Sequence, residues 1–113
     1  MAEYLQITRL NNTDLNMYQC GTEACEPGHG YGPAVRDHYL IHYILSGKGI
    51  FQVNGKRYHL RKGQGFLICP DIVTYYQADH EDPWHYSWVG FNGLKAESYL
   101  QRAGLTLDNP IFT

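Results

Sequence analysis

The chain has 113 residues, of which 43% are hydrophobic and 18% charged, and its formal net charge is −2. The length suits one domain, residues 1–113, which buries roughly 65% of the surface of its unfolded chain, and the composition excludes a disordered or membrane-spanning protein. Because no basic surplus can neutralise phosphates, we expect this chain alone to be a poor DNA binder.

The first residues, Met1 to Tyr4, lack the basic and apolar regions of a signal peptide, and no apolar run reaches the roughly 18 residues of a membrane span. The three cysteines are an odd number, and the spacing of Cys20, Cys25 and Cys69 suggests no disulfide framework. We therefore expect a cytoplasmic protein with free thiols and no membrane partner.

Residues 1–35 are expected to be a turn-rich segment, with a loop from Glu26 to Pro33. From residue 36 to about residue 91 the apolar pattern has period two and is interrupted every few residues by Gly or Pro, which is typical of short antiparallel strands in a barrel or sandwich. The predicted strands are Tyr39–Ser46, Gly49–Val53, Lys56–Leu60, Gly65–Cys69, Thr74–Ala78 and Trp84–Phe91.

The Asn54-Gly55 pair predicts a hairpin, because a type I′ turn needs positive φ at both central positions. This turn pairs Val53 with Lys56, and the pattern alternates along both strands. One face is expected to lie in the core and the other in water. The core face holds Phe51, Val53, Tyr58 and Leu60, and the wet face holds Gln52, Arg57 and His59.

After Phe91 the apolar pattern changes to that of a helix over about residues 93–103. Asn92 is the expected N-cap and Gly104 the stop signal. Ala96, Tyr99, Leu100 and Ala103 recur at helical spacing. The last residues, 109–113, resume an extended pattern.

Metal and catalytic motifs are weak in this sequence. Cys20, Cys25 and His29 lack a tight Cys-x2-Cys pair and a fourth ligand, and His38 and His42, four apart on one strand face, lack a third ligand. Neither a Gly-x-Ser-x-Gly motif nor a phosphate-binding glycine loop is present. We therefore expect no catalytic residue, no metal and no cofactor, in a protein that is not an enzyme.

The aromatic content is high, with ten tyrosines and two tryptophans. In the segment from Trp84 to Trp88, strand alternation places Trp84, Tyr86 and Trp88 on one face. Rings with a polar tip suit a lined cavity, and they also pack dry cores. A small barrel can either fill with side chains or hold one small ligand, and both interpretations stay open here.

Three blocks of sequence resemble the ligand-binding domain of AraC-type bacterial transcription regulators: residues 36–49 (RDHYLIHYILSGKG), 63–70 (GQGFLICP) and 83–91 (PWHYSWVGF). The resemblance implies an all-β double-stranded β-helix barrel, the cupin or jelly-roll fold, followed by one short helix. It also implies that the barrel senses a small-molecule effector, a mono- or oligosaccharide. DNA would then be bound only through a C-terminal helix-turn-helix domain absent from this chain. A homodimer is a further partner that the resemblance allows.

By position in the resembling blocks, the sugar-binding arginine of the family falls near Arg36, its pocket tyrosine on Tyr76 and its sugar-stacking tryptophan on Trp88. Tyr43 and Tyr86 fall on neighbouring strand positions and are expected to face the pocket. A guanidinium can bridge two hydroxyls, a tyrosine hydroxyl can donate or accept, and an indole face packs on the C–H face of a sugar.

Alternatives remain for these residues and for the function. Arg36 could instead form a surface ion pair with Asp37 or Asp79. The chain also departs from the family pattern, because Gly63-Gln64 replaces the usual Gly-Asp and Thr74 replaces a histidine at a position that metal-binding cupins use. The rival functions are a small metal-dependent cupin enzyme, an isomerase or dioxygenase, and a structural or dimerisation module with a filled barrel.

Overall fold

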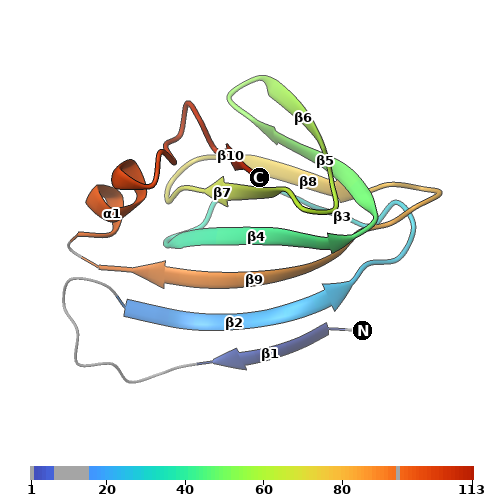
Figure 1. Cartoon of the computed structure of the whole chain (residues 1–113), viewed down its shortest axis with the longest axis horizontal. Coiled ribbons are helices and arrows are strands. Elements are labelled where there is room, and N and C mark those ends of the chain that lie inside the picture. The colour runs from blue at the N-terminus through green and yellow to red at the C-terminus, as the bar shows by residue number, and fades with distance from the viewer. Residues whose placement is uncertain (1, 7–15, 94) are drawn as a thin grey trace.

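The computed structural model describes residues 2–6, 16–93 and 95–113, and its strands form two antiparallel sheets that enclose a common core (Figure 1). One sheet has the strand order β1-β2-β9-β4-β7-β10 and the other β3-β8-β5-β6. The bounds are β1 Ala2–Gln6, β2 Asn16–Ala24, β3 Gly30–Ala34, β4 Tyr39–Ser46, β5 Lys48–Val53, β6 Lys56–Arg61, β7 Gly65–Ile68, β8 Thr74–Ala78, β9 His85–Asn92, α1 Ala96–Arg102 and β10 Ile111–Phe112. The prediction of an all-β fold with a short helix after the barrel strands is confirmed.

All six predicted strands are present, and each bound agrees within one residue. The hairpin register is also confirmed, because Val53 pairs with Lys56, Phe51 with Tyr58 and Gly49 with Leu60. Asn54 has φ +52° and Gly55 φ +74°, as a type I′ turn requires. The turn chemistry therefore fixes which residues of β5 and β6 enter the core.

Residues 1–35, which the sequence predicts to be turn-rich, contain three strands in the part that the structure describes, and β3 overlaps the predicted loop from Glu26 to Pro33. β1 and β2 extend the six-stranded sheet beyond β9, and β3 forms an edge of the smaller sheet. The sequence of β3 contains Gly30, Gly32 and Pro33, a combination that indicates a turn but is tolerated on an edge strand. Residue 1 and residues 7–15 of this segment lie outside the described residues.

The helix α1 is shorter than predicted, and its N-cap differs from the prediction. Asn92 is the last residue of β9, and its side-chain oxygen accepts a hydrogen bond from the backbone N–H of Gly93 at 2.9 Å. Lys95 occupies the N-cap position instead, without a side-chain capping bond. Gly104, with φ +80°, follows the helix as expected. Residue 94 of the predicted helix lies outside the described residues.

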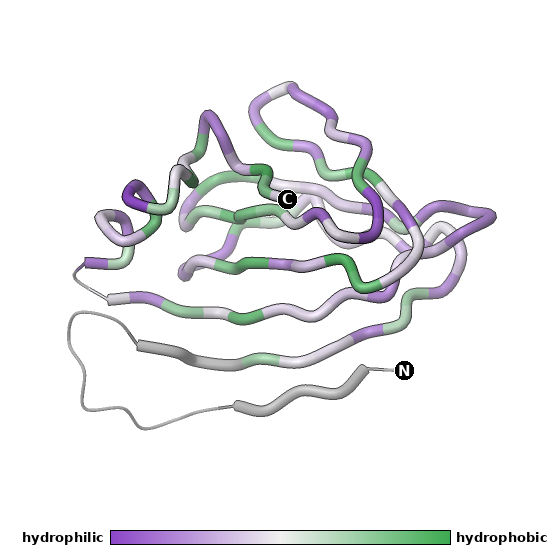
Figure 2. Tube along the Cα trace, in the orientation of Figure 1, coloured by the Kyte–Doolittle hydropathy of each residue, from purple (hydrophilic) through white to green (hydrophobic). Residues whose placement is uncertain are grey.

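Two clusters of buried residues lie on opposite faces of the six-stranded sheet. The cluster between the sheets contains the fully buried Ile44, Phe51, Phe66 and Trp84. The second cluster lies under α1 and comprises Leu67, Phe91, Ala96, Leu100 and Leu105. Figure 2 shows hydrophilic residues gathered at the β5–β6 hairpin tip and at the β8–β9 loop. None of the described helices is long and apolar enough to cross a membrane.

Candidate functional site

A row of inward-facing residues crosses the six-stranded sheet from β7 to β2. His42 lies directly opposite Phe66 on one side and Trp88 on the other, and Trp88 lies opposite Gly21. Directly opposed residues of antiparallel strands project from the same face with their Cβ atoms about 4.5–5.5 Å apart. Trp88 is half-buried against the core, and Gly21 has no side chain to cover the indole. The row thus places an indole and an imidazole side by side.

A second row crosses the smaller sheet and faces the first. Tyr31 on β3 lies opposite Tyr76 on β8, and their rings stack with centroids 5.5 Å apart. The Arg36 guanidinium lies 4.3 Å above the centre of the Tyr31 ring. Burial raises the pKa of Tyr76 to about 12, against the opposing effects of the Arg36 charge and a hydrogen bond with the Arg36 side chain. Arg36 therefore lies over the edge strand β3 and also contacts Tyr76, the buried residue of this row.

Tyr86 contacts both rows, through His42 of the first and Tyr76 of the second. Its ring centre lies 6.2 Å from that of Tyr76, and its hydroxyl donates to a carboxylate oxygen of Glu23 at 3.4 Å. Burial raises the pKa of Tyr86, and the neighbouring Tyr76, Cys25 and Glu23 raise it further. Both buried tyrosines thus stay protonated at neutral pH, so each hydroxyl can donate and accept.

His42 is the polar residue at the centre of the ring cluster, and its side chain is only 2% exposed. Its ring stacks on that of Phe66 with the ring centres 4.7 Å apart. The ring centres of Tyr76 and Tyr86 lie 5.0 Å and 4.7 Å from that of His42. Within the described part of the chain, Nδ1 of His42 has no hydrogen-bond partner. Burial, reinforced by the charge of Arg36, lowers the pKa of His42 to about 3. The ring is therefore neutral at physiological pH.

The sequence analysis treats His42 only as one of two possible metal ligands, together with His38. In the described part of the structure the two histidines do not belong to a group of three possible ligands. His38 precedes β4, and its Nδ1 bonds to the Asp37 carboxylate at 2.7 Å. No local signal could have identified His42, because Leu40 and Ile44 flank it on one strand face just as Ile41 and Leu45 flank Tyr43 on the other.

Four of the five predicted site residues lie around this cluster. They are Arg36, Tyr76, Tyr86 and Trp88. The expectation that Tyr43 faces the pocket is wrong, because Tyr43 is 41% exposed and lies opposite Ser87 and Gly65 on the outer face of the sheet. Strand alternation is the reason, since the preceding residue points into the barrel.

Among the described residues, Arg36 forms no ion pair with Asp37 or Asp79, the two surface partners that the sequence suggested. The Asp37 carboxylate bonds to His38 instead. The Asp79 carboxylate accepts backbone N–H groups of Glu81 and Asp82, both at 3.0 Å. The Arg36 side chain instead contacts Tyr31 and Tyr76 of the smaller sheet.

Trp84 belongs to the core and not to the site. It is 1% exposed, and its ring lies 5.7 Å from that of Phe66 and 6.0 Å from that of Tyr86. A Cβ at Gly49 would come within 2.6 Å of the indole, so this glycine is needed to seat it. Of the three rings that alternation places on one face, two are buried and Trp88 is partly open.

The side chains of the described residues do not fit a metal centre. Among the residues that the structure describes, no three His, Cys, Asp or Glu side chains are grouped so that they could hold an ion. All three cysteines are free thiols. Thr74, at the position where a histidine would be expected in a metal-binding cupin, is buried.

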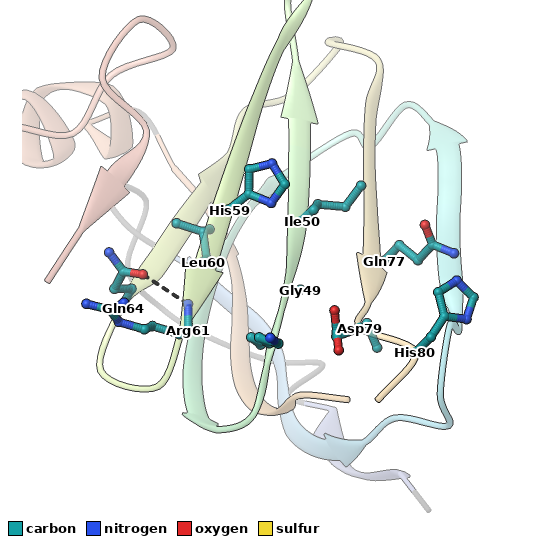
Figure 3. A pocket seen from close by; sticks show the side chains of 11 residues that line it. Gly49, Ile50, His59, Leu60, Arg61, Gln64, Gln77, Asp79 and His80 are labelled. Carbon is teal, nitrogen blue, oxygen red and sulfur yellow. Dashed lines mark hydrogen bonds between the residues drawn. The ribbon is translucent and has the colours of Figure 1, made fainter. Parts of the chain in front are cut away.

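A cleft of about 490 Å³ lies on the outer face of the smaller sheet (Figure 3). Its lining is mainly polar and comes from β5, β6, β8 and the adjoining turns: Lys48, Gly49, Ile50, His59, Leu60, Arg61, Gln64, Gln77, Ala78, Asp79 and His80. Gln64 accepts the backbone N–H of Arg61 at 2.9 Å, as Figure 3 shows. This lining includes no tyrosine or tryptophan, so the cleft offers a sugar ring neither a phenol ring nor an indole to pack on.

Comparison with known sequences gives one family and several curated relatives. The family model described as AraC-like ligand binding domain matches residues 16–113. The Msm operon regulatory protein of Streptococcus mutans is 46% identical over 96 residues, which are 85% of this chain and 34% of that protein. The lactose operon transcription activator of Staphylococcus xylosus is 35% identical over 81% of the chain and 33% of its own length. The raffinose operon transcriptional regulatory protein of Pediococcus pentosaceus is 42% identical over 75% of the chain and 32% of its own length. The chain thus spans about a third of the length of these relatives.

Comparison with solved structures supports the cupin fold. The protein YhaK from Escherichia coli superposes with a TM-score of 0.70 at 11% identity, over 85% of this chain and 46% of that one. A cupin 2 conserved barrel domain protein from Salinispora arenicola superposes with a TM-score of 0.65 at 15% identity, over 89% of this chain and 82% of that one. The prediction of a cupin jelly roll is confirmed.

Proposed function

Because the chain belongs to the family of AraC-like ligand binding domains, we propose that it senses a sugar effector for a bacterial transcription regulator. Two of the relatives named above regulate a lactose and a raffinose operon, which supports a saccharide. The observation that carries the proposal is that one cation at the edge strand, two buried hydroxyls and a half-buried indole surround the same cluster of rings. They belong to Arg36, Tyr76, Tyr86 and Trp88.

Each group has a role that its chemistry supports. The indole of Trp88 would pack on the C–H face of the sugar ring. The guanidinium of Arg36 offers five fixed N–H donors, which can bridge two neighbouring hydroxyls. The Tyr76 hydroxyl can accept from or donate to a third hydroxyl. Binding of this kind is reversible and makes or breaks no covalent bond, so the proposed role is that of a sensor and not an enzyme.

DNA binding would belong to a part of the regulator outside this chain, since the matched residues make up only about a third of the length of each relative. We propose a helix-turn-helix domain for that part, and a cytoplasmic location follows from a DNA target. We extend the proposal to a homodimer of the whole regulator, which light scattering of the full-length protein can check.

A thermal-shift and calorimetry screen tests the proposal. The probes are lactose, raffinose, galactose and glucose, with mannitol as an open-chain polyol control. A sugar at about 100 times its dissociation constant should stabilise the domain by about 2.7 kcal/mol. A panel in which no saccharide changes the melting temperature would favour a structural module with a filled barrel.

A matched pair of tyrosine variants locates the site. Tyr76→Phe removes a hydroxyl inside the barrel, and Tyr43→Phe removes one from the outer face. We expect the first to weaken sugar binding about two- to tenfold, the value of one hydrogen bond, and the second to leave it unchanged. The reverse result would place the sugar on the outer face.

A further inference from the structure

His42 lies at the centre of the ring cluster that includes Tyr76 and Tyr86, but the proposed sugar contacts give it no role. Its imidazole is enclosed by Phe66, Tyr76 and Tyr86. Nearly all buried polar atoms in folded proteins have a hydrogen-bond partner, and an exception needs an explanation. Nδ1 of His42 is such an exception among the described residues.

The strand register places His42 beside Trp88, one of the residues of the proposed sugar site. His42 lies directly opposite Trp88, on the neighbouring strand and on the same face. The other residues around the imidazole are fully or almost fully buried, whereas Trp88 is only half-buried. A ligand would therefore approach the imidazole from the side of the indole.

The charge state of His42 restricts which ligand group it can bind. A neutral imidazole carries one N–H and one lone pair, so Nδ1 is either a donor or an acceptor. A hydroxyl can match Nδ1 in both tautomers, whereas a phosphate or carboxylate accepts only. Protonation, which would suit an anion, is opposed by burial and by the nearby Arg36. The carboxylate of Glu23, at the Tyr86 hydroxyl, adds a negative charge to the same cluster.

We propose that Nδ1 of His42 forms a hydrogen bond with a hydroxyl group of the bound sugar, and that this contact selects an uncharged sugar over its phosphate ester or its uronic acid. This inference rests on the proposed function. It adds a binding residue deep in the barrel and names the chemical class of the effector.

The test replaces the imidazole by a ring that has no nitrogen. His42→Phe keeps an aromatic ring between Phe66 and the two tyrosines, and His59→Phe makes the same change on the exposed outer face of β6. Calorimetry with the sugar that binds the wild type most tightly is expected to show a 10- to 100-fold weaker affinity for His42→Phe and no change for His59→Phe. The melting temperature of ligand-free His42→Phe should be equal to or higher than that of the wild type, because an unsatisfied polar atom has been removed.

Two outcomes of this comparison overturn the inference. Affinity of His42→Phe within twofold of the wild type shows that the sugar does not contact the imidazole. A lower melting temperature together with unchanged affinity shows that the imidazole has a structural role. If His42→Phe does not fold, nitrogen NMR of the wild-type imidazole decides, because sugar should shift the Nδ1 resonance of His42 and an unchanged resonance refutes the contact.

The selectivity is tested with glucose, galactose and their 6-phosphates, and with galacturonate. We expect the neutral sugars to bind at least tenfold more tightly than the charged forms, and equal or tighter binding of the charged forms overturns the selectivity. If the wild type binds no sugar of any kind, the proposed function fails and this inference fails with it. If the wild type binds a sugar and His42→Phe binds it equally well, only the inference fails.

Discussion

Replacing Trp88 by phenylalanine should weaken sugar binding while leaving the fold intact, and the same change at Trp84 should do the opposite. Both indoles face the interior of the barrel from the same strand region. Trp88 is half-buried, whereas Trp84 is 1% exposed and contacts Phe66 and Tyr86. The two substitutions are chemically identical, so any difference between them reports the position and not the residue type.

The expected magnitudes follow from burial. A tryptophan side chain buries about 150–250 Å² when fully enclosed, and Trp88 is less than two fifths exposed, so at most about 90 Å² of it is open for a ligand to cover. At about 25 cal/mol per Å², complete loss of this contact in Trp88→Ala costs on the order of 1–3 kcal/mol of affinity. The phenylalanine ring keeps part of the contact, so Trp88→Phe should lose about 1 kcal/mol, or about fivefold in Kd.

At Trp84 the loss falls on stability instead. Removing part of a fully buried ring leaves a cavity, and we expect Trp84→Phe to lower the free energy of unfolding by about 1–3 kcal/mol. Calorimetric titration with the sugar that binds the wild type gives the affinities, and thermal or urea unfolding gives the stabilities. Equal affinity of the wild type, Trp88→Phe and Arg36→Ala would refute the reasoning and place the ligand elsewhere.

Three further predictions concern pH, DNA and metal. The pKa of His42 is lowered to about 3 in the folded chain, against an ordinary value of 6.5, so unfolding takes up a proton at pH values between the two. The free energy of unfolding should therefore fall as the pH falls through this window, by at most about 1.4 kcal/mol per pH unit. Unfolding curves at about pH 7 and pH 5 should therefore diverge less for His42→Phe than for the wild type, and identical divergence contradicts a buried imidazole. A gel shift on an operator at physiological salt should be blank, since α1 and its N-cap offer only Lys95 and Arg102 as cations, and a specific complex at submicromolar protein contradicts this. Elemental analysis after dialysis should find less than one equivalent of any transition metal, and stoichiometric retention would favour a metal-dependent enzyme.

Local sequence signals were sufficient for the central strands and for the hairpin. Asn54-Gly55 sets its own backbone geometry, and the alternation on either side of it decides which residues face the core. The same alternation correctly grouped Trp84, Tyr86 and Trp88 on one face. These features depend only on residues close together in the chain, so the sequence determined them without knowledge of the fold.

Pairing partners far apart in the chain decided the remaining features. β2 gains its neighbours only by lying between β1 and β9, and β3 is a strand because it pairs with β8, although its glycines and proline favour a turn. Strand order is set by contacts across the whole chain, and no local pattern records it.

The orientation of β4 shows most clearly what only the tertiary structure decides. Both of its faces carry apolar residues, because the outer one is partly covered near Ile41 by the cluster under α1. Alternation separates His42 from Tyr43 but does not say which of the two points into the barrel. The tertiary structure buries the histidine among aromatic rings and exposes the tyrosine. That choice depends on which face meets the smaller sheet, because burial is a property of the assembled layers and not of the strand.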